Sequence, residues 1–418
     1  MKEISKYLIQ FMNREFLHNV PVKTTFNDTL QFSTNSIEFL QKIHQNVANA
    51  DIEWVHNKDK ITETVVDCNN NLPKGNFYDN ISPEIQRLIE THPKTGRKYN
   101  FTINTQNICV NLVLPLQNQN ETHISNTLIA NYFQKCLHKI YCWLYIGNIY
   151  KPSNCSQHIT IYIYLTEHFK VLPKRNNSIQ KSIGPVNANS ALTTSCRKYT
   201  DIHLYREEEW FKVFIHETFH CLGLDFSGEN NTEATAEILQ MFPLHSEVNL
   251  YETYCEMFAE IINVIFYIYF TKKNNKKLSM KTFRELIQYE RVFSCFQSAK
   301  VISFYNLTYN GIIHKTSHSK VKTNYKETTN VLSYYIIKSI MMFYINEYIE
   351  WIVLHNKGSL SFVKTNDNIA NYSGFVREHY KLSEYVNIIG YFEKWVSRHK
   401  NANTLETTSM RMTALEFV

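Results

Sequence analysis

The most informative part of the sequence is the stretch Phe214–Phe226, F-I-H-E-T-F-H-C-L-G-L-D-F, in which two histidines stand four residues apart. On an α-helix, residues i and i+4 share one face about 6 Å apart. His216 and His220 can therefore bind one Zn²⁺ through their Nε2 atoms. Glu217 directly follows the first histidine and lies at the flank, where it can accept a proton from a water molecule on the metal. The stretch predicts a zinc site with a carboxylate base beside it.

The alternative is a pair of core histidines with no ligand. The chain contains 17 histidines, so the spacing alone is weak evidence. The neighbouring residues, however, are strongly apolar: Trp210, Phe211, Val213, Phe214, Ile215, Phe219 and Leu222. Two unpaired imidazoles and a carboxylate would be costly to bury in such a helix. The surroundings therefore favour a metal site.

The elements around this helix predict an α+β protein. Alternating or β-branched residues indicate strands within 99–116, at 158–165 and at 201–205, and a short strand at 191–194, with a long helix over 124–146. Glu207, Glu208 and Glu209 should open the histidine helix, and Gly223 should end it. Later segments at 251–270, 280–297, 331–354 and 378–399 are helical. We expect a mostly helical region of unknown role at 1–95, a sheet-bearing subdomain with the histidine helix at 96–225, and a helical subdomain at 226–418.

Residues 99 to 262 resemble the zincin superfamily of metallopeptidases in their order of strands and helices and in H-E-T-F-H. The resemblance implies a small mixed sheet whose antiparallel edge strand lies over the substrate cleft and pairs with the peptide backbone. In this chain it assigns that role to the region of Asn187, Ala188 and Asn189, ahead of the strand at 191–194. It also implies Zn²⁺ as cofactor and a protein or peptide as substrate.

A third protein ligand is needed, and two residues compete for the role. In the metzincin branch Gly223 fits, but Asp225 comes one residue too early. In the gluzincin branch the ligand is a Glu on a later helix. The stretch Glu256-Met-Phe-Ala-Glu260 resembles the Glu-x-Phe-Ala-Glu form of that branch, which implies Glu256 as ligand. Glu260 could then accept a hydrogen bond from the far nitrogen of a ligand histidine.

Glu252 belongs to the same four-residue repeat as Glu256 and Glu260, and we expect it to be solvated. A donor for the developing oxyanion is also needed. The candidates, His245, Tyr251, Tyr254 and Tyr309, are not distinguished by the sequence.

Taken together, residues 210–226, L-Y-E-T-Y-C-E-M-F-A at 250–259 and N-V-L-S-Y-Y-I-I-K at 330–338 resemble proteins of large nucleocytoplasmic DNA viruses assigned as zinc metallopeptidases. The resemblance implies an endopeptidase in the host cytoplasm or the virion, with Glu217 as general base. The alternative is a non-catalytic scaffold or virion component that keeps the fold. Glu217 favours the enzyme, since a structural site needs no base; a metal-dependent amidohydrolase is a third, minor alternative.

Bulk composition narrows the possible partners and the compartment. The net charge of +6 comes from interspersed acids and bases, which argues against nucleic-acid binding. Nine scattered cysteines without a Cys-x-x-Cys pair argue against a disulfide framework. The N-terminus lacks a signal-peptide pattern, and the most apolar segments, 261–270 and 331–354, are too short or too charged to span a bilayer. We therefore predict a protein that is not secreted and has no membrane span; its oligomeric state is open.

Overall fold

The computed structural model describes residues 1–18, 26, 30–91, 94–115, 126–174, 182–272, 277–314 and 318–417. It is a mixed α+β structure, 59% helical with one six-stranded mixed sheet, which confirms the expected class. The strands are β1 (Thr62–Val66), β2 (Lys94–Ile103), β3 (Gln106–Pro115), β4 (His158–Tyr164), β5 (Ala191–Thr193) and β6 (Tyr199–Leu204).

The sheet has the order β1-β2-β3-β4-β6-β5. β1, β2 and β3 form an antiparallel meander, β4 and β6 continue it in parallel, and β5 closes the edge antiparallel to β6. The segment 99–116, expected to contain one strand, holds parts of two, because Asn104 takes a left-handed conformation (φ 52°) in a tight turn that pairs Ile103 with Gln106. The antiparallel edge strand expected at 191–194 is present as β5.

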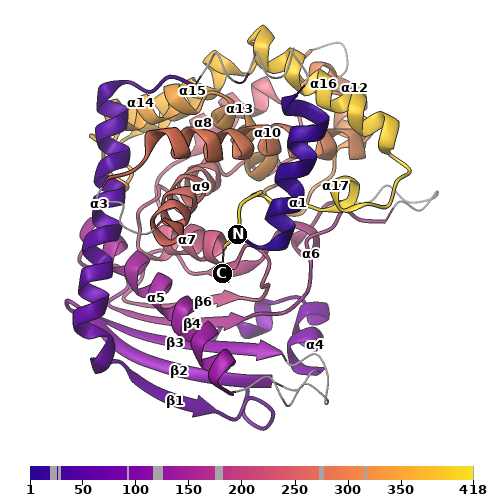
Figure 1. Ribbon diagram of the computed structural model, residues 1–418. Coiled ribbons are helices and arrows are strands. Elements are labelled where there is room, and N and C mark those ends of the chain that lie inside the picture. Colours follow the sequence, from indigo (N-terminus) through magenta and orange to yellow (C-terminus); the bar gives the residue numbers. More distant parts are fainter. Residues whose placement is uncertain are drawn as a thin grey trace.

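Helices surround the sheet and dominate the second half of the chain. Figure 1 shows the sheet at the base of the molecule and the later helices above it. The first half contains α1 (Glu3–Met12), η1 (Asn13–Leu17), α3 (Thr34–Asn57), η2 (Lys58–Lys60), η3 (Tyr78–Asn80), α4 (Pro83–Thr91), α5 (Asn126–Tyr150) and α6 (Pro185–Ala188). The second half contains α7 (Trp210–Cys221), α8 (Thr232–Met241), α9 (Leu250–Thr271), α10 (Met280–Phe304), α11 (Tyr309–Ile313), α12 (His318–Asn324), η6 (Leu332–Ile337), α13 (Lys338–Phe343), α14 (Ile345–His355), α15 (Asn366–His379), α16 (Ser383–His399) and α17 (Leu405–Thr408).

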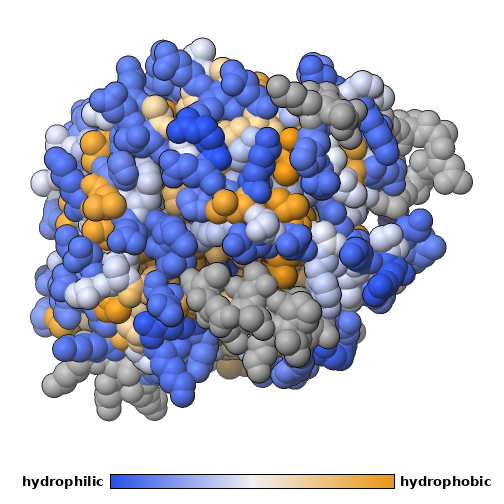
Figure 2. All heavy atoms as spheres, turned by 90° about the horizontal axis from the view of Figure 1, so that it is seen from above, coloured by the Kyte–Doolittle hydropathy of each residue, from blue (hydrophilic) through white to orange (hydrophobic). Residues whose placement is uncertain are grey.

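One large hydrophobic core joins the three expected regions, since it contains residues from Leu8 to Phe417. Residues 1–95 contribute β1 to the sheet and α3, which packs on α5 and α9. α9 is the one helix within the described ranges that is long and apolar enough to cross a membrane, but 83% of its apolar window is buried in the protein. On the face seen from above, hydrophilic side chains predominate and hydrophobic ones form small groups (Figure 2). The described residues therefore show no clear membrane span.

The histidine helix α7 lies between the sheet and α9, and a residue with positive φ flanks it at each end. It begins at Trp210, after Glu209 in a left-handed conformation (φ 60°), so the expectation that Glu207–Glu209 form its first turn is wrong. It ends as expected at Gly223 (φ 67°), whose N–H donates to the carbonyl of His220 at 3.0 Å. A side chain there would meet Cys155 Sγ at 2.8 Å, so the turn requires glycine for its φ and for space.

A disulfide joins Cys155 to Cys196 beside this turn. The N–H of Cys196 donates to the carbonyl of His220 at 3.2 Å, so the bridge fixes a loop against the end of α7. The scattered cysteines argued against a disulfide framework, and the other seven are indeed free. The single bridge was missed because its partners are 41 residues apart and meet only through the fold.

A second, smaller hydrophobic cluster joins α4 and the segment before it to residues of the sheet. At its margin His203 of β6 is fully buried and stacks on Tyr162, with ring centroids 4.7 Å apart. Gly75 packs against the same two rings. Neither ring nitrogen of His203 has a hydrogen-bond partner among the described residues. Burial lowers the pKa of His203 to about 4.

We expect His203 to make the protein acid-sensitive. An unfolded histidine binds a proton below about pH 6.5, whereas folded His203 does so only below about pH 4. Between these values the unfolded state binds more protons, so stability falls as pH falls, by about 3 kcal/mol in total. His203→Phe keeps the stacked ring and should remove that part of the pH dependence of the unfolding free energy, measured by urea denaturation between pH 7 and 4. Tyr162→Phe, which leaves His203 in place, is the control; identical pH slopes in His203→Phe and wild type would refute the assignment.

Candidate metal centre

Three ligand-type atoms meet where α7 packs on α9. The Nε2 atoms of His216 and His220 lie 3.2 Å apart. Oε2 of Glu252 lies 3.1 Å from the first and 3.3 Å from the second. Ligand atoms on a tetrahedral zinc with bonds of about 2.0–2.1 Å are about 3.3–3.4 Å apart. This triangle therefore has the size of one face of a zinc coordination tetrahedron.

Glu252 was expected in solvent, and that expectation is wrong: its side chain is only 12% exposed. Glu256, expected in its place, lies on the far side of the His216 ring. Its Oε1 is 2.9 Å from Nδ1, off the line of the ring N–H, and its Oε2 bonds Lys212 and lies 3.3 Å from Lys338. The structure therefore brings Glu252, and not Glu256, to the Nε2 atoms.

Asp225, the competing candidate for third ligand, contacts the far nitrogen of the other histidine. Its Oδ2 bonds Nδ1 of His220, and its Oδ1 accepts from the N–H and hydroxyl of Ser227 at 3.1 and 2.9 Å. Each histidine thus has a carboxylate near Nδ1, with a hydrogen bond at His220 and a close charge contact at His216. Carboxylates at the far nitrogen orient metal-binding imidazoles and raise their basicity. Glu260, expected to hold such a nitrogen, instead pairs with Lys338 at 2.7 Å, so that expectation is wrong.

Glu252 and the two histidines influence one another's charge. Burial alone would raise the pKa of Glu252, but His220 and His216 lower it well below its usual range. Burial alone would lower the pKa of His216, but Glu252 and Glu256 raise it. With Nδ1 turned to a carboxylate on each ring, the Nε2 atoms and the Glu252 oxygen bind either protons or a metal ion. The donor set of two imidazoles and one carboxylate suits Zn²⁺.

Glu217 is brought beside the histidines, as expected. It is 8% exposed and has no hydrogen bond or ion pair to any residue that the structure describes. Burial raises its pKa, and the two histidines partly offset the rise. Its oxygens are not among the fully buried atoms that lack a partner, so they are open to solvent at the cluster, and no neighbouring side chain binds them.

Tyr334 and Asn330 complete the cluster and were not assigned from the sequence. The Tyr334 hydroxyl donates to Oε2 of Glu252 at 3.2 Å, and the Asn330 amide donates to Oε1 at 3.2 Å. Tyr334 lies on η6, a π-helical segment, and its ring centroid is 5.9 Å from that of His216. π-Helical turns often occur at functional sites. In the sequence, residues 330–338 contribute to the resemblance to the viral proteins, but that resemblance does not single out this tyrosine.

Of the four oxyanion-donor candidates from the sequence, three lie elsewhere or bind other groups. His245 is exposed. The hydroxyls of Tyr254 and Tyr309 donate to the carbonyls of Leu360 and Tyr380. Only Tyr251 contacts the cluster, with its ring edge-on to His220 at 6.0 Å.

Asn187, Ala188 and Asn189 precede the edge strand and do not form it. Asn187 and Ala188 belong to the helical turn α6. The Asn187 amide donates to the Val171 carbonyl at 2.9 Å, and the Asn189 amide oxygen accepts from Thr329 at 2.7 Å. The side chains of Asn187 and Asn189 thus fix the loop that precedes β5. The expected position is corrected to β5 (Ala191–Thr193), which packs on α7.

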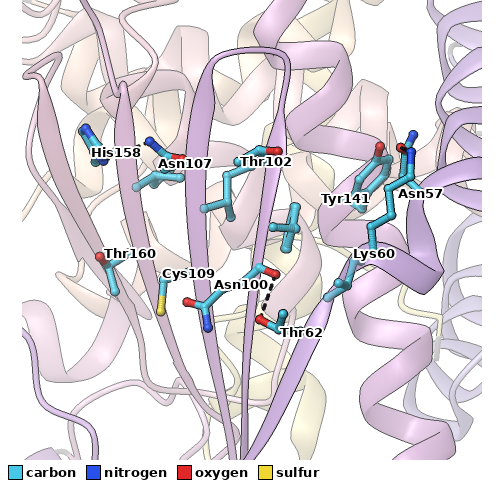
Figure 3. A pocket seen from close by; sticks show the side chains of 14 residues that line it. Asn57, Lys60, Thr62, Asn100, Thr102, Asn107, Cys109, Tyr141, His158 and Thr160 are labelled. Carbon is cyan, nitrogen blue, oxygen red and sulfur yellow. Dashed lines mark hydrogen bonds between the residues drawn. The ribbon is translucent and has the colours of Figure 1, made fainter.

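Two other features of the described residues are separate from this cluster. Asp51, His138 and Cys142 form a ligand-type group on α3 and α5, in which Asp51 already accepts from His138 and Tyr269. A cavity of about 540 Å³ lies on the sheet and is lined by both apolar and polar side chains, with Asn107 beside His158 and Thr62 bonded to the Asn100 carbonyl (Figure 3). It shares no residue with the histidine cluster.

A scan against protein-family models found no match, and searches of curated proteins and of solved structures found none either.

Proposed function

We propose that the protein is a zinc-dependent endopeptidase of the zincin kind, with His216, His220 and Glu252 as ligands. The observation that carries the proposal is the triangle of Nε2, Nε2 and Oε2 atoms with sides of 3.1 to 3.3 Å beside an unpartnered Glu217. The proposal differs from the resemblance in the third ligand. The resemblance implies Glu256, whereas the proposed ligand, Glu252, lies one helical turn before the Glu-x-Phe-Ala-Glu stretch. Glu256 then orients His216 from behind.

The edge strand supports a peptide substrate. β5 lies antiparallel at the border of the sheet and packs on the histidine helix. Its outer side can pair with an extended peptide, which would bring the peptide backbone alongside α7. Buried Arg206 supports this edge by donating to the carbonyls of Val186 and Asn189 at 2.6 and 2.9 Å.

The side chains supply the remaining chemistry. A zinc ion held by the three ligands would activate a water molecule and polarise the substrate carbonyl. Glu217 accepts a proton at its carboxylate and passes it to the leaving amine. The Tyr334 hydroxyl, which here donates to Oε2 of Glu252, would turn to donate its hydrogen bond to the oxyanion that develops on the substrate.

Glu217 also favours the enzyme over the scaffold alternative. A structural zinc site needs the ligands and their supporting carboxylates, but it gains nothing from an acid beside the ligands that binds no neighbour. The viral setting and the cytoplasmic or virion location remain predictions from the sequence.

We expect zinc-loaded protein to cleave a denatured protein substrate and members of a random peptide library. A zinc chelator should abolish cleavage, and added Zn²⁺ should restore it. Mass spectrometry of the products is the measurement. Protein with one zinc per chain and no cleavage of either substrate would favour the scaffold.

A further inference from the structure

The segment Ser409–Phe417 is buried throughout, although apart from a bridge between Ser409 and Val171 it belongs to no helix or strand. An irregular backbone inside a protein is stable only if its N–H and C=O groups find partners. Here side chains of the surrounding helices supply them.

Two carboxylates bind the N–H groups of the segment. Glu209 accepts from Met412 and Thr413 at 2.7 and 2.6 Å. Glu290 of α10 accepts from Ala414 and Leu415 at 2.9 and 2.8 Å.

The carbonyls are bound in the same way from three other elements. The Met410 carbonyl accepts from Tyr335 at 2.5 Å, the Met412 carbonyl from Lys338 at 2.8 Å and the Leu415 carbonyl from Asn263 at 3.1 Å. The segment is thus held as an irregular peptide by these side chains, which together form the groove in which it lies.

One end of this groove is the start of the histidine helix. Glu209 immediately precedes Trp210 and has a left-handed backbone, which costs a residue other than glycine about 1–2 kcal/mol. Its N–H donates to the carboxylate of Glu416 at 2.5 Å, and the helix has no side-chain cap of its own. The segment therefore holds Glu209 in this conformation and fixes where α7 begins.

The groove also reaches the carboxylate behind His216. Lys338, which donates to the Met412 carbonyl, pairs with Glu260 at 2.7 Å and with Glu256 at 3.3 Å. Lys212 bonds Glu256 and lies 3.9 Å from the Met412 sulfur. Glu256 in turn lies 2.9 Å from Nδ1 of His216.

We propose that Ser409–Phe417 acts as a built-in peptide ligand whose docking positions α7 and Glu256 and thereby strengthens metal binding. The inference rests on the proposed metal site. Because coupling between two binding events is reciprocal, zinc must hold the segment in its groove as strongly as the segment favours zinc.

The test uses the complete chain with a protease recognition sequence inserted between Ala402 and Asn403, which are both exposed. After folding and cleavage, the C-terminal peptide is no longer covalently attached, and only its non-covalent contacts hold it in the groove. A labelled peptide spanning 403–418 is exchanged in, and its release into excess unlabelled peptide is timed with and without ZnCl₂. Excess unlabelled peptide fills the groove as soon as the labelled peptide leaves. The measurement therefore does not require the protein to be stable with an empty groove.

Loss of a supporting carboxylate weakens metal binding about tenfold or more. By reciprocity the peptide's affinity should rise by a similar factor with zinc, and since affinity differences lie mainly in dissociation rates, release should slow about tenfold. The same cut chain carrying His220→Ala is the control and should release peptide at one rate in both conditions. Equal rates with and without zinc in a chain that binds zinc would overturn this inference alone. A chain that binds no zinc would overturn the metal site as well.

Discussion

Glu217→Gln should lower kcat/KM for peptide hydrolysis by about 10²- to 10⁴-fold while zinc content stays at the wild-type value. Glutamine keeps the size and position of the side chain but cannot take up a proton. Glu217 makes no hydrogen bond or ion pair to any described residue, so loss of its charge should not lower the thermal unfolding temperature. Peptide cleavage, zinc analysis and calorimetry on the same preparation measure the three quantities.

Glu247→Gln provides a matched control, because Glu247 is exposed and lies outside the cluster. It should leave cleavage unchanged. Equal cleavage by Glu217→Gln and wild type would remove Glu217 from the reaction, and loss of zinc in Glu217→Gln would assign it a role in metal binding instead.

The second large effect separates the two glutamates of α9. Glu252→Ala should leave only a small fraction of the zinc, since it removes one of three protein ligands. Glu256→Gln should retain the metal but bind it about 10- to 100-fold more weakly, because Gln can still contact Nδ1 of His216 without carrying the charge. Competition with a chelator of known zinc affinity gives both values.

Asp225→Asn removes the charge of the carboxylate at Nδ1 of His220. Like Glu256→Gln, it should retain the metal but weaken zinc binding. If instead Glu256→Gln lost the zinc and Glu252→Ala kept it, the ligand originally expected from the sequence would be restored and the geometry of the cluster would need another explanation.

The sequence predicted the elements that depend on local pattern. The histidine helix, its end at Gly223, the edge strand at 191–193 and the long helices over 126–150 and 250–271 follow from periodicity and from residues with special backbone conformations. The pairing of His216 with His220 is likewise local, because both lie on one helix.

The choice among Glu252, Glu256 and Glu260 depends on how α9 is rotated and shifted against α7, which no local pattern encodes. The three residues repeat every four positions, so all lie on one face, and a shift of one turn exchanges their roles. Tyr334 was missed for a related reason: it lies more than one hundred residues after His220, on a π-helical segment that changes which side chains share a face. The carboxylates that bind the segment 409–417 likewise depend on tertiary contacts between distant residues.

The proposed zinc ion lies between His216, His220 and Glu252. A crystal structure of the zinc-loaded protein, with anomalous scattering recorded above and below the zinc absorption edge, would locate it. We expect one anomalous peak per chain, about 2.0–2.2 Å from the two Nε2 atoms and one carboxylate oxygen of Glu252. A peak coordinated by Glu256 or Asp225 in place of Glu252, or no peak at the histidines in zinc-containing crystals, would contradict it.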